Sequence, residues 1–133
     1  MRDATLVVMR HGESTWTDKT VNRFAGWADI PLTMRGRDQA RHAGELIHDA
    51  GIEPDAAFTS LLRRSIETCD IVLDAVDRLW VPVMRSWRLN ERHYGSFQGE
   101  TRPAMRERYG DELFKTYRRS YDVRPPKIAD ESP

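Results

Sequence analysis

A short apolar run that stops abruptly in a polar cluster constrains this chain most. Residues 5–9 are apolar and rich in β-branched side chains, and Arg10-His11-Gly12-Glu13-Ser14 follows directly. Such a run is typical of a strand buried in a parallel sheet. Open α/β sheets bind their ligands beyond the carboxyl ends of their strands. The sequence therefore predicts a buried strand over 5–9 and a ligand site immediately after it.

A long loop and a helix are expected next. Residues 15–31 have no hydrophobic period and contain Gly26 and Pro31, so they predict a loop of a length that is often functional. Thr33 is a predicted helix N-cap, and Gly51 is a suitable residue just past the helix end. Between them the expected apolar stripe consists of Ala40, Ala43, Ile47 and Ala50.

Strand and helix patterns then alternate. A second strand is predicted over 56–59, followed by a helix that Ser60 could cap and whose stripe runs over 62–76. Cys69 falls on that stripe and is expected to fill the core. A third strand is predicted over 80–84, where Pro82 favours a sheet edge or a strand start. This order predicts an α/β fold with a doubly wound, mostly parallel sheet and flanking helices.

The C-terminal third has a different character. Helices are predicted over 102–109 and 111–121, and the end of the chain is rich in proline and polar residues. We expect residues 1–122 to belong to one domain and residues 123–133 to form an extended tail or linker.

Composition excludes several classes of protein. The 133 residues suit at most one ordinary domain, and Leu, Ile, Val and Phe make up only 27 of them. No apolar run has the roughly 20 residues of a membrane span, and residues 6–9 are too short for a signal-peptide core. A single cysteine, no metal-ligand spacing and a net charge of +0 predict a cytoplasmic protein without metal or nucleic-acid partners.

Several residues could carry chemistry. A histidine at a strand end beside a fixed guanidinium stays neutral and nucleophilic, and Arg10 could bind an incoming phosphoryl group beside His11. Arg64 follows a second strand end, at a helix start that attracts phosphate. Glu91 is an acid/base candidate. From the residues alone, a structural histidine, a solvated carboxylate and a solvated Arg118-Arg119 pair are alternatives. The excess of 18 Arg over 3 Lys fits either polyanion recognition or codon bias.

Longer motifs make these candidates more specific. They include Arg10-His11-Gly12-Glu13-Ser14, Asn22-Arg23-Phe24-Ala25-Gly26-Trp27, Thr59-Ser60 with Arg64, Ser86-Trp87-Arg88-Leu89-Asn90-Glu91-Arg92-His93-Tyr94-Gly95 and Arg118-Arg119-Ser120-Tyr121. With these motifs the chain resembles the cofactor-dependent phosphoglycerate mutases of the histidine phosphatase superfamily. The resemblance covers nearly the whole chain.

The resemblance implies a role for each matching residue. His11 would be the phosphohistidine nucleophile, Arg10 and Arg64 its phosphate clamps, and Glu91 the proton donor and acceptor. The implied reaction interconverts 3-phosphoglycerate and 2-phosphoglycerate, with 2,3-bisphosphoglycerate as the phosphoryl primer and no metal. The partner would be a small phosphorylated three-carbon acid, with a homo-oligomer as a possibility. Implied substrate-binding positions are Ser14, Thr17, Ala25, Gly26, Arg92, His93, Tyr94, Arg102, Arg118 and Arg119.

Some features depart from the family. Thr17 stands where Asn is usual, Ala25 where Thr is usual, and Arg102 where Lys is usual. The family is nearly twice as long, and nothing after Tyr121 matches the strand that ends in its second catalytic histidine. We therefore expect a truncated form of the fold. Three functions compete: a mutase, a non-catalytic phosphate-binding fragment, and a phosphatase of the same superfamily.

Overall fold

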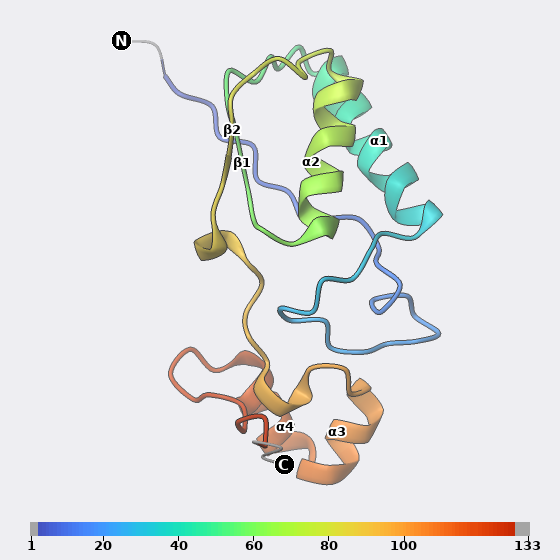
Figure 1. Cartoon of the computed structure of the whole chain (residues 1–133), viewed down its shortest axis with the longest axis vertical. Helices are drawn as coiled ribbons and strands as arrows, with labels where there is room; N and C mark the ends of the chain where they lie inside the picture. The colour runs from blue at the N-terminus through green and yellow to red at the C-terminus, as the bar shows by residue number, and fades with distance from the viewer. Residues whose placement is uncertain (1–2, 130–133) are drawn as a thin grey trace.

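The computed structural model describes residues 3–129 and has α/β architecture (Figure 1). Helices α1 and α2 pack against each other beside a small parallel sheet of two strands, while α3 and α4 lie together at the opposite end of the molecule. The elements in chain order are α1 (Met34–Asp49), β1 (Ala57–Thr59), α2 (Arg63–Ala75), β2 (Val83–Arg85), α3 (Arg102–Tyr109) and α4 (Asp111–Arg119). Two single 3-10 turns precede α3, at Trp87–Leu89 and Gly95–Phe97.

The predicted helices all form. The Thr33 hydroxyl accepts a hydrogen bond from the Gly36 N–H, which confirms Thr33 as the N-cap of α1. Gly51 follows the helix end with φ +67°, a left-handed conformation that glycine adopts readily. Helix α3 has the predicted bounds, and α4 ends at Arg119 rather than at Tyr121.

Strands β1 and β2 pair in parallel, with Ala57 opposite Val83. Both are shorter than predicted. Pro82 directly precedes β2, and its carbonyl accepts a hydrogen bond from the Ala57 N–H at 2.9 Å. A proline can accept but not donate, so its position at a strand start confirms the prediction.

The predicted buried strand over 5–9 is wrong. This segment has no strand structure, and Leu6 and Val8 are 83% and 82% exposed. The run has the composition of a buried strand, but no strand pairs with it in the described part of the chain, whose sheet consists of β1 and β2. Apolar composition alone does not form a strand, because a strand also needs a neighbour that satisfies its backbone groups.

Two local predictions also need correction. Leu62, not Ser60, is the N-cap of α2. The Ser60 hydroxyl accepts a hydrogen bond from the Leu62 N–H, and Leu62 lies one position before the helix begins. The buried face of α1 consists of Gly36, Ala40 and Gly44, whereas Ala50 is exposed. Small residues occupy this face because α1 lies very close to α2: a Cβ on Gly44 would be 2.5 Å from the Ala75 Cβ.

A second core holds the α3–α4 end together. Phe24, Phe97, Met105 and Phe114 form an almost fully buried cluster. The segment after α4 packs back on this end, where the Ser96 N–H donates to the Pro126 carbonyl at 2.8 Å. Residues 123–129 contain no helix or strand, and the predicted tail over 130–133 lies outside the described residues. The assignment of the tail as a linker therefore stays a prediction.

Among residues 3–129, no helix is both long and apolar enough to cross a membrane.

The close approach of α1 and α2 can be tested by Gly44→Ala. Alanine favours a helix interior by about 1 kcal/mol over glycine, but here the added methyl would clash with Ala75 and with the Val72 carbonyl. We expect the free energy of unfolding in urea to fall by about 1–3 kcal/mol. Asp38→Ala, at an exposed position of the same helix, should change it by less than about 0.5 kcal/mol. A more stable Gly44→Ala protein would contradict the packing described here.

Candidate functional site

The segment after residue 9 passes against the N-terminal parts of α1 and α2. A Cβ on Gly12 would lie 2.1 Å from the Gly36 carbonyl oxygen, and a Cβ on Gly36 would lie 2.0 Å from the Glu13 carbonyl oxygen. Two glycines therefore allow backbone-to-backbone contact between this segment and α1. The contact holds His11 beside the first turn of α2, which begins at Arg63.

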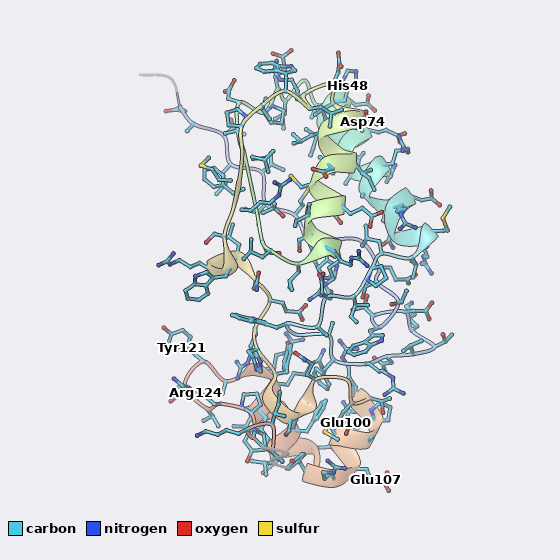
Figure 2. The ribbon with its side chains drawn as sticks, viewed as in Figure 1. His48, Asp74, Glu100, Glu107, Tyr121 and Arg124 are labelled. Atoms are coloured by element: carbon cyan, nitrogen blue, oxygen red, sulfur yellow. The ribbon has the colours of Figure 1, made fainter. Side chains whose placement is uncertain are left out.

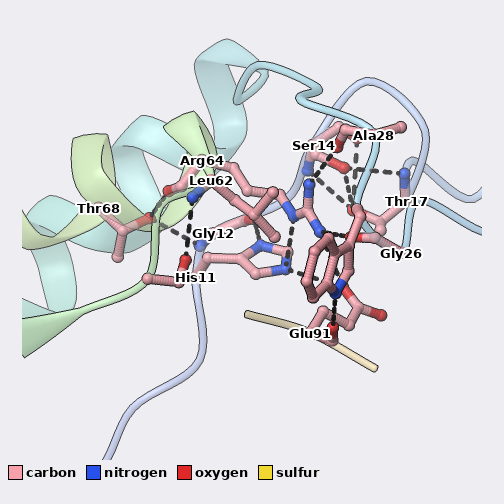
Figure 3. Close-up of polar contacts among 12 residues, drawn as sticks. His11, Gly12, Ser14, Thr17, Gly26, Ala28, Leu62, Arg64, Thr68 and Glu91 are labelled. Carbon is pink, nitrogen blue, oxygen red and sulfur yellow. Dashed lines mark hydrogen bonds and ion pairs between the residues drawn. The ribbon is translucent and has the colours of Figure 1, made fainter. Parts of the chain in front are cut away.

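The side chains of His11, Arg64 and Glu91 meet at this point (Figure 3). The Arg64 Nε–H donates to the His11 Nε2 over 3.3 Å, and an Arg64 Nη–H donates to the Glu91 carboxylate over 3.0 Å. The His11 Nε2 lies 3.8 Å from the same Glu91 oxygen. Three of the four residues predicted as catalytic are thus in direct contact.

The hydrogen bonds of His11 define its tautomer. Its Nδ1 lies 2.6 Å from the Gly12 carbonyl oxygen, which can only accept, so in the neutral ring Nδ1 carries the proton. The Nε2 lone pair then accepts the hydrogen bond from Arg64. A neutral imidazole with an unprotonated Nε2 can act as a nucleophile toward an anionic phosphorus centre once the Arg64 Nε–H turns from Nε2 to an oxygen of the incoming phosphoryl group.

Arg64 is fully buried, and its remaining hydrogen bonds go to the loop before α1. The guanidinium donates to the Ala28 carbonyl at 2.8 Å and to the Gly26 carbonyl at 2.7 Å. Gly26 has φ +53°, which turns its carbonyl toward α2 without the strain a side chain would cause. These bonds fix the direction in which the guanidinium faces His11.

The Glu91 carboxyl group has a pKa below its ordinary value of 4.5. Its burial raises the pKa, but a hydrogen bond with the protonated form of the His11 imidazole and the charge and hydrogen bond of Arg64 lower it further than burial raises it. Glu91 is therefore ionised at neutral pH, in the form that accepts a proton.

The other predicted residues near His11 differ in their positions. Arg10 is exposed, and within residues 3–129 its side chain has no hydrogen bond or ion pair. Ser14 is fully buried, and its hydroxyl lies 3.0 Å from that of Thr17, which also accepts from the Ser14 N–H. Ala25 is buried and presents no polar side-chain atom. Ser14 and Thr17 thus stabilise a turn beside the cluster.

Arg92 and its neighbours connect to the other end of the molecule. The Arg92 guanidinium donates to the carbonyls of Tyr117, Ser120 and Val123 at the end of α4. His93 accepts from the Gly95 N–H and packs against Trp27, while Tyr94 packs on Phe24. These contacts lie within the protein, and the role of the three side chains in substrate binding stays a prediction.

A second group of cations lines a cleft of about 390 Å³. Arg102, Arg106 and Arg118 face it, and the buried Arg102 Nε has no hydrogen-bond partner in the described part of the chain. Burial and the neighbouring cations Arg119 and Arg102 lower the pKa of Arg118 from its ordinary value. The cleft lies on the α3–α4 part of the molecule, so the predicted arginines fall into two groups.

Four residues to which the sequence analysis assigned no role hold the site together. The Thr68 hydroxyl accepts from the Gly12 N–H, and Asn90 accepts from the Leu61 N–H. The Trp27 indole donates to the Glu91 carbonyl, and its backbone N–H donates to the Gln98 side chain. Thr68 is a polar residue four positions after Arg64 on a buried helix face, a pattern that could have identified it.

This arrangement defines an α/β protein with a histidine–arginine–glutamate cluster suited to phosphoryl groups. Residues 6–133 match the model of the histidine phosphatase superfamily (branch 1), and the chain belongs to that superfamily. Among residues 3–129 no three His, Cys, Asp or Glu side chains gather as a metal site would require.

Curated relatives agree in sequence over half their length. The chain is 51% identical over 130 residues to a 2,3-bisphosphoglycerate-dependent phosphoglycerate mutase of Corynebacterium kroppenstedtii, covering 98% of this chain and 52% of the relative. It is 56% identical over 123 residues to the enzyme of the same name from Bifidobacterium longum, covering 92% and 49%. The chain thus spans about half the length of the curated relatives it matches.

Solved structures agree in fold. A mycobacterial glucosyl-3-phosphoglycerate phosphatase has a TM-score of 0.73 at 25% identity, covering 86% of this chain and 51% of that one. A phosphoglycerate mutase from Bacillus anthracis has a TM-score of 0.66 at 28% identity, covering 80% and 47%. These similarities confirm the predicted phosphoglycerate mutase-like α/β fold.

The lowered pKa of Glu91 predicts a pH-dependent contribution to stability. A carboxyl whose pKa is lower in the folded than in the unfolded chain stabilises the fold above its unfolded pKa, and this contribution is lost as the pH falls through the folded pKa. We expect the difference in unfolding free energy between the parent chain and Glu91→Gln to shrink as the pH falls from about 5 to about 3. Urea unfolding at each pH measures it.

The control for this experiment is Glu107→Gln, which removes an exposed carboxylate of α3 (Figure 2). The effect of Glu107→Gln on the free energy of unfolding should be small at every pH tested. A Glu91→Gln difference that stays constant over the same pH range would show that the ionised carboxylate does not stabilise the fold.

Proposed function

We propose that this chain carries the phosphohistidine site of a 2,3-bisphosphoglycerate-dependent phosphoglycerate mutase, which interconverts 3-phosphoglycerate and 2-phosphoglycerate. The observation that carries the proposal is the contact of His11 with a fully buried Arg64 and with the ionised Glu91. Relatives that are 51% and 56% identical are named for this activity, which supports the choice among phosphoryl-transfer reactions.

His11 is the proposed nucleophile. Its Nε2 lone pair forms the bond to phosphorus while the bond from phosphorus to the donor oxygen breaks, and the departing oxygen takes a proton from the protonated form of Glu91. The Nδ1–H keeps its hydrogen bond to the Gly12 carbonyl throughout. The Arg64 Nε–H, which donates to Nε2, then has a phosphoryl oxygen within reach as an acceptor. A fixed, buried cation is an effective way to stabilise charge on the transferring group, because it needs no rearrangement during the reaction.

Glu91 is the proposed proton acceptor. In the second half of the reaction a substrate hydroxyl attacks phosphorus, the bond from phosphorus to Nε2 breaks, and the hydroxyl proton moves to the Glu91 carboxylate. The lowered pKa of Glu91 keeps it ready to accept that proton at neutral pH. Arg10, exposed beside His11, is the proposed second phosphate clamp.

The cationic cleft is chemically suited to an anionic substrate and primer. Three guanidinium groups offer donors to phosphate or carboxylate oxygens, and one of these donors, the buried Arg102 Nε, has no hydrogen-bond partner within residues 3–129. When bound, 2,3-bisphosphoglycerate supplies the phosphoryl group that primes His11. We propose that Arg102, Arg118 and Arg119 hold the anionic groups, and that Ser14, Thr17 and Gly26 shape the wall beside His11. We propose that the enzyme acts on this small molecule in the cytoplasm and can assemble as a homo-oligomer.

A phosphatase of the same superfamily is the second candidate. The glucosyl-3-phosphoglycerate phosphatase named above has the same fold over 86% of this chain, which favours this alternative. The chemistry differs only in the acceptor, because water replaces the substrate hydroxyl. Comparing phosphate release with phosphoglycerate interconversion in the same sample distinguishes the two.

His11→Ala tests the nucleophile. We expect the parent chain to gain an acid-labile phosphoryl group from 2,3-bisphosphoglycerate, and His11→Ala to gain none, because no other residue supplies the covalent step. Glu91→Gln should still become phosphorylated but should transfer the group at least about 100-fold more slowly. Intact-mass measurement and a rapid-quench time course give both values.

The matched control is His48→Ala, since His48 is exposed at the C-terminal end of α1 (Figure 2). It should be phosphorylated as the parent chain is. A phosphoryl adduct on His11→Ala, or its absence from the parent chain, would exclude the proposed mechanism; in the latter case a phosphate-binding function without catalysis would stand.

Arg118→Gln tests the cleft. Removing one charge-assisted hydrogen bond should weaken 3-phosphoglycerate binding by about 10- to 100-fold, because such bonds contribute about 1.5–3 kcal/mol. Calorimetric titration measures the affinity. Arg108→Gln, which removes an exposed arginine that does not line the cleft, should bind like the parent chain. Equal affinities of both variants would place the substrate elsewhere.

A further inference from the structure

Thr68 links the proposed nucleophile to the proposed phosphate clamp through one hydroxyl group. The side chain is buried in α2, and its Oγ1–H donates to the Arg64 carbonyl at 2.7 Å. A hydroxyl has one proton to donate, so its lone pairs are free to accept. One of them accepts from the Gly12 N–H at 3.1 Å (Figure 3).

The Gly12 N–H belongs to the peptide that follows His11. Gly12 is buried, and in the described part of the chain this N–H has the Thr68 hydroxyl as its hydrogen-bond partner. A buried N–H without a partner is strongly disfavoured, so the peptide orientation depends on this acceptor. That orientation in turn fixes the direction from which the His11 side chain leaves the backbone.

The opposite side of Gly12 is already limited by α1. The Gly36 carbonyl oxygen would be 2.1 Å from a Cβ at Gly12, so the backbone has no space to move toward α1. The hydrogen bond to Thr68 restrains the same peptide from α2. The backbone after His11 is thus held between two helices, by packing on one side and by a directed hydrogen bond on the other.

We propose that Thr68 is a positioning residue that aligns the His11 Nε2 with the Arg64 guanidinium. The proposal rests on the proposed role of His11 as the phosphoryl acceptor. The inference goes beyond that role of His11, because Thr68 touches neither the substrate nor the reacting atoms. Thr68→Val keeps the shape of the side chain and removes the acceptor, so the Gly12 peptide loses its restraint while the helix keeps its packing.

The experiment compares Thr68→Val and Thr68→Ser with Thr116→Val. Thr116 provides a matched control, because its hydroxyl also donates to the carbonyl four residues earlier, that of Glu112, but accepts no hydrogen bond within residues 3–129. We expect Thr68→Val to slow phosphorylation of His11 by 2,3-bisphosphoglycerate by about 10- to 100-fold at saturating donor, with the donor affinity unchanged. Thr68→Ser should restore the rate, and Thr116→Val should not change it.

Two measurements do not depend on activity. Amide hydrogen exchange should show a protected Gly12 N–H in the parent chain and in Thr68→Ser, and faster exchange at Gly12 in Thr68→Val. Imidazole ¹⁵N chemical shifts should show a single Nδ1–H tautomer of His11 in the parent chain and a mixture in Thr68→Val. If the parent chain is not phosphorylated at all, the proposed function fails, but these two measurements still decide the role of Thr68.

The proposal is overturned if folded Thr68→Val keeps the exchange rate of Gly12 and the tautomer of His11. It is also overturned if Thr68→Ser loses both as completely as Thr68→Val does, since the serine hydroxyl should replace the acceptor. If Thr68→Val does not fold, Thr68→Ser decides: a protected Gly12 N–H and a parent-like tautomer support the proposal, and their loss contradicts it.

Discussion

The burial of the Arg64 guanidinium is the constraint on which the rest of the structure depends. A charge removed from water needs hydrogen-bond partners and an opposite charge, and leaving it unpaired costs about 3–5 kcal/mol. The chain supplies them from distant segments: Gly26 and Ala28 in the long loop, and Glu91 beyond β2. One buried cation thus fixes the path of the long loop, which contains no helix, and of the segment around Glu91. That segment pairs with no strand among the described residues.

The same arrangement prepares the site for an anion. Glu91 balances the charge of Arg64 from one side, while His11 contacts the Arg64 Nε and leaves the imidazole lone pair facing a cation. A phosphoryl oxygen near Nε2 would meet a donor that is already oriented, and fixed donors of this kind account for much of the rate in phosphoryl transfer. The stability of the fold and the proposed chemistry therefore both require a buried, fixed Arg64 guanidinium.

Local patterns in the sequence predicted the helices well. Thr33 and Gly51 have side-chain and backbone preferences that act within a few residues, and the ends of α1 follow from them. The predicted strand over 5–9 failed because pairing depends on residues far away in the chain, which composition does not reveal. The sequence identified Arg64 as a phosphate-binding candidate at a helix start but did not predict its full burial, since a charged residue at an exposed helix start would have the same local sequence.

The sequence predicted which side chains lie together at the centre of the site, but it predicted the contacts at the edges of the site less well. His11, Arg64 and Glu91 meet as expected, but the Arg92 guanidinium is used by carbonyls at the end of α4 instead of facing His11. An arginine uses the same N–H donors to bind backbone carbonyls and to bind a ligand. Only the position of α4 decides which of these two roles Arg92 has. A buried threonine four positions after Arg64 could have marked Thr68 as a candidate, but this spacing does not reveal its hydrogen-bond partner, Gly12.

Three consecutive residues join the two ends of the molecule. Asn90 accepts from the Leu61 N–H just before α2, Glu91 pairs with Arg64 within it, and Arg92 holds the last carbonyls of α4. Successive side chains of an extended segment point in opposite directions, so adjacent residues can contact different elements. One short segment therefore contacts α2 through Asn90 and Glu91 and the end of α4 through Arg92. Since α4 carries Arg118 at the cationic cleft, the same segment connects the histidine–arginine–glutamate cluster to the part of the molecule that carries the cleft.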